Sequence, residues 1–135
     1  MNTAFVSPYA LASLHTDAQQ AAACFILDAD ASLFAAHFPG NPILPGVVQI
    51  GMVAKVIAAC PEWRMGEADI DEVVNVKYLH IIDPRIHSKV CINVSGKPTA
   101  DGRWHFRATL ASDVTADAVR FSTISLIMHG HSSSR

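Results

Sequence analysis

A histidine, a proline-rich loop and an apolar run follow one another in the middle of the chain. Residues 37–46 read HFPGNPILPG, so His37 precedes three prolines that hold the loop stiff. An imidazole exchanges protons near neutral pH, and a rigid loop fixes where it does so. The pattern therefore indicates acid–base chemistry by His37.

The apolar segment that begins at Gly46 supplies a second chemical tool. Residues 46–60 read GVVQIGMVAKVIAAC, are apolar on nearly every face and end at Pro61, which predicts a buried helix. The free N–H groups of its first turn, including those of Gly46 and Val47, point outward at the positive end of the helix dipole. They can bind a negative charge that develops on an oxygen atom, and a glycine lets a ligand approach closely.

This ordered motif resembles the signature of the FabZ and FabA dehydratases, which act on 3-hydroxyacyl-acyl-carrier-protein substrates in fatty-acid synthesis. The letters PGVVQ at residues 45–49 are also similar to the single-domain dehydratases of aryl-polyene clusters. The resemblance implies a hotdog fold, in which an antiparallel sheet of about six strands wraps around one central helix. Residues 1–130 would form this single domain, and residues 131–135 a disordered tail.

The same resemblance implies a reaction. Family members remove water from a (3R)-hydroxyacyl chain that phosphopantetheine carries as a thioester, in tunnels at a dimer interface. His37 matches the base at Cα, and the amides of Gly46 and Val47 match the donors that polarise the thioester carbonyl. Acyl carrier protein or coenzyme A would present the substrate, and no cofactor is expected. The residues expected to line or gate the tunnel are Phe38, Pro39, Gly40, Ile43, Leu44, Pro45 and Gly51.

The sequence departs from the family at the second catalytic position. The family carries Glu or Asp fourteen residues after the motif histidine, where this chain has Gly51. Lys55 stands where the family often has Gln, and a spacing of four residues puts it on the same helix face as Gly51. Lys55 either replaces the acid as proton donor or charge partner, or extends from the helix into solvent. Alternatively, His37 acts alone.

The elements that must hold this loop are predicted from the patterns on both sides of it. Residues 10–16 and 20–30 form an opening hairpin around a turn at Asp17 and Ala18. Four β-branched and aromatic segments follow the helix and are separated by turn signals, which predicts antiparallel strands. These segments cover residues 73–82, 87–96, 104–112 and 119–128. The element order indicates an α+β fold with one sheet around one helix.

Composition narrows the classes of function. The chain has 135 residues, of which 50% are hydrophobic and 16% charged, with a formal net charge of -2. These values favour one soluble domain that forms a homodimer or higher oligomer, and they offer no basic field for nucleic acid. The N-terminus lacks signal-peptide features, and no apolar run reaches the roughly 20 residues that span a bilayer. We therefore expect a cytoplasmic protein.

Cysteines and histidines outside the motif suggest structural roles. Cys24, Cys60 and Cys91 are isolated and flanked by apolar residues, so we expect buried reduced thiols in a reducing cytoplasm rather than a disulfide or a metal site. The histidine spacing also gives no metal-binding pattern. The histidines on or beside strands that we expect to be structural are His80, His87 and His105.

Three functions are compatible with these residues. The first is a dehydratase of fatty-acid or polyketide-type biosynthesis with His37 as base. The second is a hotdog thioesterase that activates water, although thioesterases also normally use a helix carboxylate. The third is a non-catalytic acyl-thioester-binding partner of a competent dehydratase, which Gly51 favours.

Overall fold

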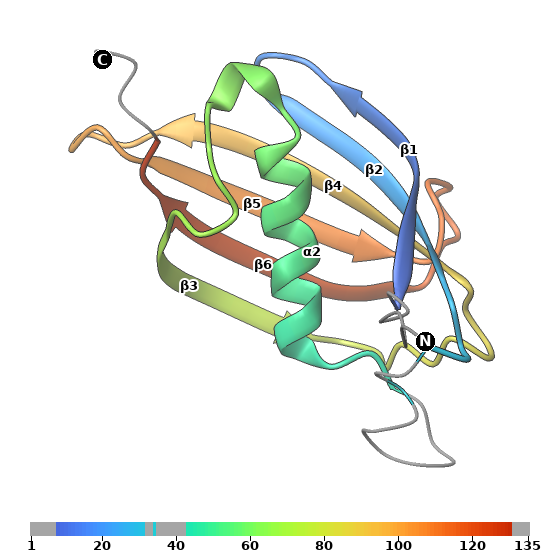
Figure 1. Cartoon of the computed structure of the whole chain (residues 1–135). Helices are drawn as coiled ribbons and strands as arrows, with labels where there is room; N and C mark the ends of the chain where they lie inside the picture. The colour runs from blue at the N-terminus through green and yellow to red at the C-terminus, as the bar shows by residue number, and fades with distance from the viewer. Residues whose placement is uncertain (1–7, 32–33, 35–42, 131–135) are drawn as a thin grey trace, which may run out of the picture.

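Six strands form one antiparallel sheet, and helix α2 crosses one face of it (Figure 1). The computed structural model describes residues 8–31, 34 and 43–130. The elements are β1 (Tyr9–Thr16), β2 (Gln20–Leu27), α2 (Gly46–Ala58), the short 3-10 helix η1 (Pro61–Trp63), β3 (Ile70–Tyr78), β4 (Lys89–Pro98), β5 (Trp104–Ala111) and β6 (Arg120–Met128). This architecture confirms the predicted hotdog fold, opening hairpin and central helix. The predicted tail at residues 131–135 lies outside the described residues.

The strand order in the sheet is β1-β2-β4-β5-β6-β3, so β3 forms one edge although it lies in the middle of the sequence. It begins earlier and ends earlier than the pattern at residues 73–82 predicted. The amides of Leu79 and His80 both donate to the carbonyl of Phe121, and the chain then leaves the ladder. In register, Tyr78 lies opposite Ser122 of β6, so both side chains face the helix.

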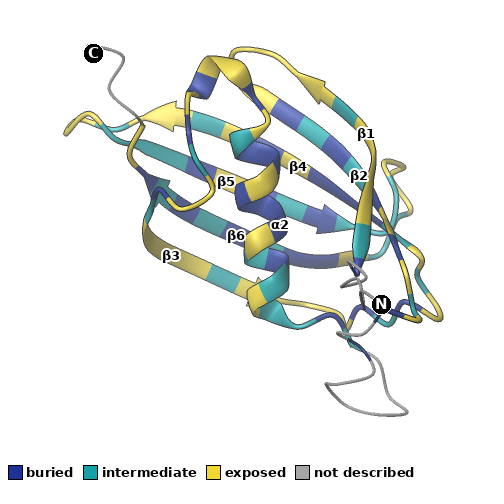
Figure 2. Ribbon diagram, in the orientation of Figure 1, coloured by how far each residue is buried: buried dark blue, intermediate teal, exposed yellow. Residues whose placement is uncertain are grey.

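The core lies between the sheet and one side of the helix. Met52, Val53, Val56 and Ile57 of α2 are buried there against large sheet side chains such as Phe106. The prediction of a buried helix therefore holds for the side of α2 that the sheet covers, although the segment is apolar on nearly every face. Figure 2 shows exposed bands on the helix surface that faces away from the sheet.

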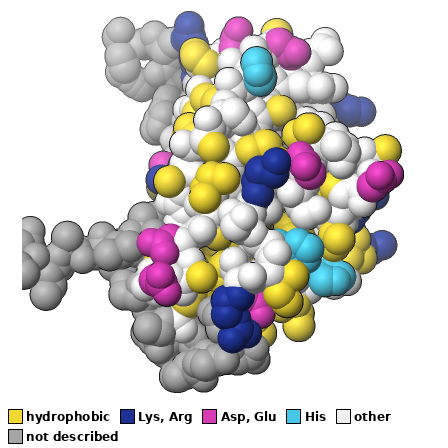
Figure 3. Space-filling model, turned by 90° about the vertical axis from the view of Figure 1, so that its right-hand side faces the viewer, with side chains coloured by type: hydrophobic (Ala, Val, Ile, Leu, Met, Phe, Trp, Pro, Cys, Tyr) yellow, Lys and Arg dark blue, Asp and Glu magenta, His cyan; other side chains and the backbone are white. Residues whose placement is uncertain are grey.

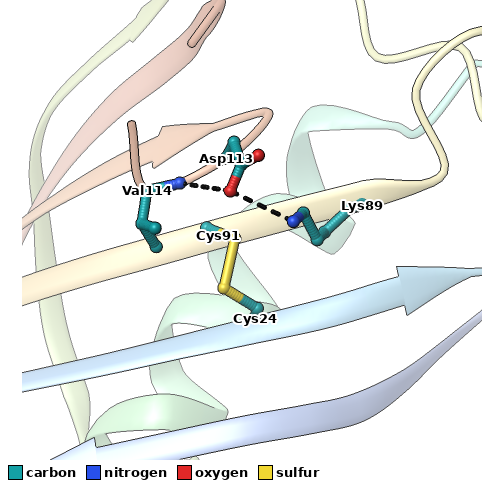
Figure 4. Close-up of a disulfide and its surroundings, with 5 residues drawn as sticks. All are labelled: Cys24, Lys89, Cys91, Asp113 and Val114. Atoms are coloured by element: carbon teal, nitrogen blue, oxygen red, sulfur yellow. Dashed lines mark hydrogen bonds and ion pairs between the residues drawn. A yellow bond between two sulfur atoms is a disulfide. The ribbon is translucent and has the colours of Figure 1, made fainter. Parts of the chain in front are cut away.

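A disulfide joins Cys24 of β2 to Cys91 of β4, with their Cα atoms 4.0 Å apart (Figure 4). The prediction of three reduced thiols was wrong for this pair and right for Cys60, which is free and buried. The cysteines are 67 residues apart in sequence, but β2 and β4 are neighbours and place them directly opposite each other. The basis for placing the chain in a reducing compartment is thereby removed.

The surface view in Figure 3 shows cationic and anionic side chains interspersed among apolar ones. Within residues 8–31, 34 and 43–130, no helix is long and apolar enough to cross a membrane. In the same residues, no three His, Cys, Asp or Glu side chains gather closely enough to hold a metal ion.

Candidate functional site

Leu44 lies in the part of the proline-rich loop that the structure describes, and its contacts hold the end of the loop in place. Its side chain is buried, its amide donates to the carbonyl of Ile82 at 2.9 Å, and its carbonyl accepts from Gln49 Nε2 at 3.2 Å. Hydrogen bonds to both the amide and the carbonyl of Leu44, one of them from the Gln49 side chain, hold the chain between the segment after β3 and the first turns of α2. The loop that carries His37 therefore enters the helix from a fixed point, while His37, Phe38, Pro39 and Gly40 lie outside the described residues.

Gln49 connects this point to the sheet. Its amide oxygen accepts a hydrogen bond from Ser122 Oγ of β6 at 2.8 Å, and both residues are buried. A buried glutamine among apolar side chains would be costly without hydrogen-bond partners. Gln49 has one partner for its amide nitrogen and one for its amide oxygen. The side chain thus links loop, helix and sheet at one place.

Replacing Gln49 with Met should lower the free energy of unfolding by about 1–3 kcal/mol, because Ser122 Oγ and the Leu44 carbonyl would lose a partner inside the core. Urea unfolding followed by circular dichroism measures the change. Gln19→Met is the matched control, since Gln19 is exposed and should shift stability by less than about 0.5 kcal/mol. Equal midpoints for the two variants would contradict a structural role for the bridge.

The start of α2 offers free backbone donors. Pro45 precedes the helix in an extended conformation without a side-chain cap, and its carbonyl accepts from the amides of Val48 and Gln49, both at 3.1 Å. No described residue accepts a hydrogen bond from the Gly46 or Val47 amide. The first turn also lacks an acidic side chain. An anionic or strongly polarised oxygen is the partner that such amides favour.

Tyr78 lies directly against Gly46. A Cβ atom built on Gly46 would come within 2.3 Å of the Tyr78 hydroxyl oxygen and 2.4 Å of the ring carbon that carries it. Any larger residue at position 46 would therefore displace the tyrosine. Glycine at this position leaves room for the end of the Tyr78 side chain, whereas the sequence suggested only that it admits a ligand.

A pocket of about 440 Å³ opens at this helix end. The loop and helix contribute Ile43, Leu44, Pro45, Gly46 and Gln49 to its lining. The segment from the end of β3 contributes Tyr78, Leu79, His80, Ile81 and Ile82. Mostly apolar walls and a few polar groups beside free amides suit an acyl chain with a polar carbonyl head.

A family model for ApeI-like proteins, described as ApeI dehydratase, matches residues 13–119. The chain belongs to the ApeI-like dehydratase family. The match covers most of the chain and confirms the resemblance that the motif indicated. No curated protein sequence matches the chain significantly.

Solved structures agree with the fold of this ApeI-like chain. The dehydratase heterocomplex ApeI:P from Xenorhabdus doucetiae matches with a TM-score of 0.66 and 18% identity, covering 92% of this chain and all of that one. An uncharacterised protein from Erwinia carotovora gives 0.59 at 20% identity, covering 87% and 93%. A mutant thioesterase from Pseudomonas aeruginosa gives 0.55 at 13% identity, covering 89% and 81%. At these identities the likeness shows the fold alone.

The exposed side of α2 carries the two positions at which the ApeI-like chain departs from the FabZ and FabA pattern. Val47, Gly51 and Lys55 are all exposed, which agrees with one helix face at a spacing of four residues. Nothing lies within 4 Å of a Cβ built on Gly51. Lys55 Nζ lies 3.5 Å from Glu67 Oε2, and its side chain is 47% exposed. Lys55 therefore has an ionic partner outside the pocket lining.

Two pocket residues were missed by sequence reasoning. Tyr78 carried no motif signal, and only its register opposite Ser122 brings it to the helix start. His80 was assigned a structural role, yet it is exposed and lines the pocket, with Nδ1 2.9 Å from the carbonyl of Ile81. Its ring also lies edge-on to His87, 6.0 Å between centroids. The position of His80, directly after a strand that ends at the helix start, was the available signal.

Proposed function

We propose that the chain binds a (3R)-hydroxyacyl thioester, carried on acyl carrier protein or coenzyme A, and removes water from it to give the enoyl thioester. The observation that carries the proposal is the apolar pocket beside the free amides of Gly46 and Val47, at the end of the HFPGNPILPG motif. Membership of the ApeI-like dehydratase family supports the reaction class.

The proposed chemistry needs one base and one set of oxyanion donors. His37 removes the proton from Cα, and the electron pair moves toward the thioester carbonyl, whose oxygen the Gly46 and Val47 amides hold. The pair then forms the Cα–Cβ double bond as the Cβ–O bond breaks. Without a carboxylate at position 51, the imidazolium of His37 returns its proton to the departing hydroxyl. Water leaves and neutral His37 is restored.

The proposed assembly is a homodimer or an oligomer of dimers, joined at β3. This edge strand and the segment after it expose several apolar side chains, a pattern that suits burial against another subunit. They are Val73, Val74, Leu79, Ile81 and Ile86. A second subunit there would enclose the pocket and complete the acyl tunnel. The phosphopantetheine-borne substrate supports the cytoplasm as the proposed compartment, whereas the Cys24–Cys91 disulfide is of a kind that is rare in a reducing cytoplasm.

A non-catalytic role is the second candidate, and Gly51 favours it. The matching structure from Xenorhabdus doucetiae is a dehydratase heterocomplex, so a hotdog chain that works with a different partner has a structural counterpart. In that case this chain would hold the thioester and complete the tunnel of a competent dehydratase. A thioesterase is a third candidate, since structures of that class also match.

One experiment separates these functions. The purified protein is incubated with 3-hydroxyacyl thioesters of acyl carrier protein and of coenzyme A, and the thioester is followed by mass spectrometry. Loss of one water supports the dehydratase, and release of free acid supports the thioesterase. An unchanged thioester that co-elutes with the protein supports the binding partner. An unchanged thioester that does not bind overturns the proposal.

Replacing Lys55 with Met tests whether this lysine supplies the missing acid. If it does, turnover of the enoyl thioester in the hydration direction should fall by about 10²-fold or more. Unchanged turnover would leave Lys55 as a surface residue. The exposed ion pair with Glu67 is worth at most about 1 kcal/mol, so the variant should fold. Glu67→Gln is the control, because it removes the same ion pair and keeps the lysine.

A further inference from the structure

The end of the Tyr78 side chain lies against the Gly46 backbone, where a Cβ atom would otherwise stand, and next to the free Gly46 amide. The end of its ring rests on the Gly46 backbone, and both residues line the same pocket. Tyr78 comes from the last position of β3, whose register with Ser122 turns it toward the helix. It is therefore held by the sheet, independently of the loop that carries His37.

The Tyr78 hydroxyl is available to donate. None of the described residues forms a hydrogen bond with it, and the residue is 52% exposed, so a ligand in the pocket can reach it. Partial burial raises the pKa of the phenol above its usual value, which keeps the O–H protonated at neutral pH. A protonated phenol beside free amides forms a hydrogen-bond donor set for one oxygen atom.

We infer that the Tyr78 hydroxyl and the Gly46 amide together hydrogen-bond the thioester carbonyl oxygen, with Tyr78 as a second oxyanion donor. The inference rests on the proposed function and adds a residue to its site. The phenol donates a hydrogen bond and keeps its proton throughout. To do so, the ring moves from its rest on Gly46 by enough to admit the oxygen between the two donors.

The absence of a carboxylate at position 51 increases the effect that such a donor has on the rate. When no acid assists the departing hydroxyl, negative charge on the carbonyl oxygen must build up further before the Cβ–O bond breaks. Donors aimed at that oxygen then lower the barrier more than they would in a concerted elimination. Removing one oxyanion donor commonly costs about 10²–10³ in turnover, and a comparable loss is expected for Tyr78.

The test uses Tyr78→Phe, which keeps the ring against Gly46 and removes only the oxygen. The probe is crotonyl-pantetheine labelled with ¹³C at the thioester carbonyl, whose infrared stretching band moves to lower frequency as hydrogen bonds to that oxygen strengthen. The wild-type protein should lower the frequency of this band on binding, and Tyr78→Phe should return it toward the value of the free thioester. Turnover should fall by about 10²–10³, with a smaller change in KM. Tyr9→Phe, at the other tyrosine of the chain, should leave both readings unchanged.

An identical bound band in the wild type and Tyr78→Phe would overturn the inference while leaving the proposed function intact. A bound band that shifts in the wild type without any loss of water would overturn the dehydratase and still support Tyr78 as a carbonyl donor. Failure of the labelled thioester to bind at all would overturn both. Circular dichroism melting of each variant confirms that the comparison is between folded proteins.

Discussion

Gly51→Glu should raise the rate of dehydration by about 10²–10⁴-fold, the usual worth of a positioned general acid or base. The substitution returns a carboxyl group to the position where the FabZ and FabA pattern has one. Nothing lies within 4 Å of a Cβ built on Gly51, so the new side chain enters open space on the exposed face of α2. Rates with a 3-hydroxyacyl thioester, measured against wild type under the same conditions, give the result.

Stability changes must be separated from this gain. Glycine within a helix costs roughly 0.5–1 kcal/mol relative to alanine, so alanine, glutamate or glutamine at position 51 should each strengthen α2. Gly51→Ala shares that effect and lacks the carboxyl group, and Gly51→Gln matches the size and hydrogen bonding of glutamate without its acidity. Only Gly51→Glu should gain turnover. Equal rates in all three variants would contradict the view that the missing acid limits this chain, and the absence of turnover in all three would favour the non-catalytic partner.

The sequence predicted the parts of this molecule that depend on local pattern. The α2 helix follows from the apolar run between Gly46 and Pro61, and five of the six strands begin within two residues of their predicted starts. The free amides at the start of α2 could also be predicted from their place in the sequence, because every helix leaves its first N–H groups without intrahelical partners. The HFPGNPILPG motif then identified the family, since so long an ordered match constrains loop, turn and helix start together.

Features that depend on pairing between distant strands could not be predicted. Tyr78 meets Gly46, and Ser122 meets Gln49, only because β3 pairs with β6 in one particular register. Cys24 meets Cys91 only because β2 and β4 are neighbours although α2 and β3 separate them in sequence. A shift of one residue in either register would turn these side chains to the other face. Such contacts are decided by the packing of the whole sheet.

His37→Asn should abolish the gain that Gly51→Glu produces. The added carboxyl group can assist only the departure of the hydroxyl, and that step requires the electron pair left at Cα after a base has removed its proton. In wild type, His37→Asn is expected to lower turnover by about 10²–10⁴-fold. In the Gly51→Glu background it should bring the rate down to the same low level, so the two effects are far from additive.

The four rates of this double-mutant cycle also identify the base if it is not His37. His15→Asn is the control, because His15 lies exposed on β1, outside the lining of the helix-end pocket. If the gain survived His37→Asn, the base would have to be another group at the pocket, and His80 is the histidine that the described residues place there. The backbone carbonyl of Ile81 engages its Nδ1, which leaves Nε2 as the atom able to accept a proton. His80→Asn in the Gly51→Glu background would then remove the gain that His37→Asn had left in place.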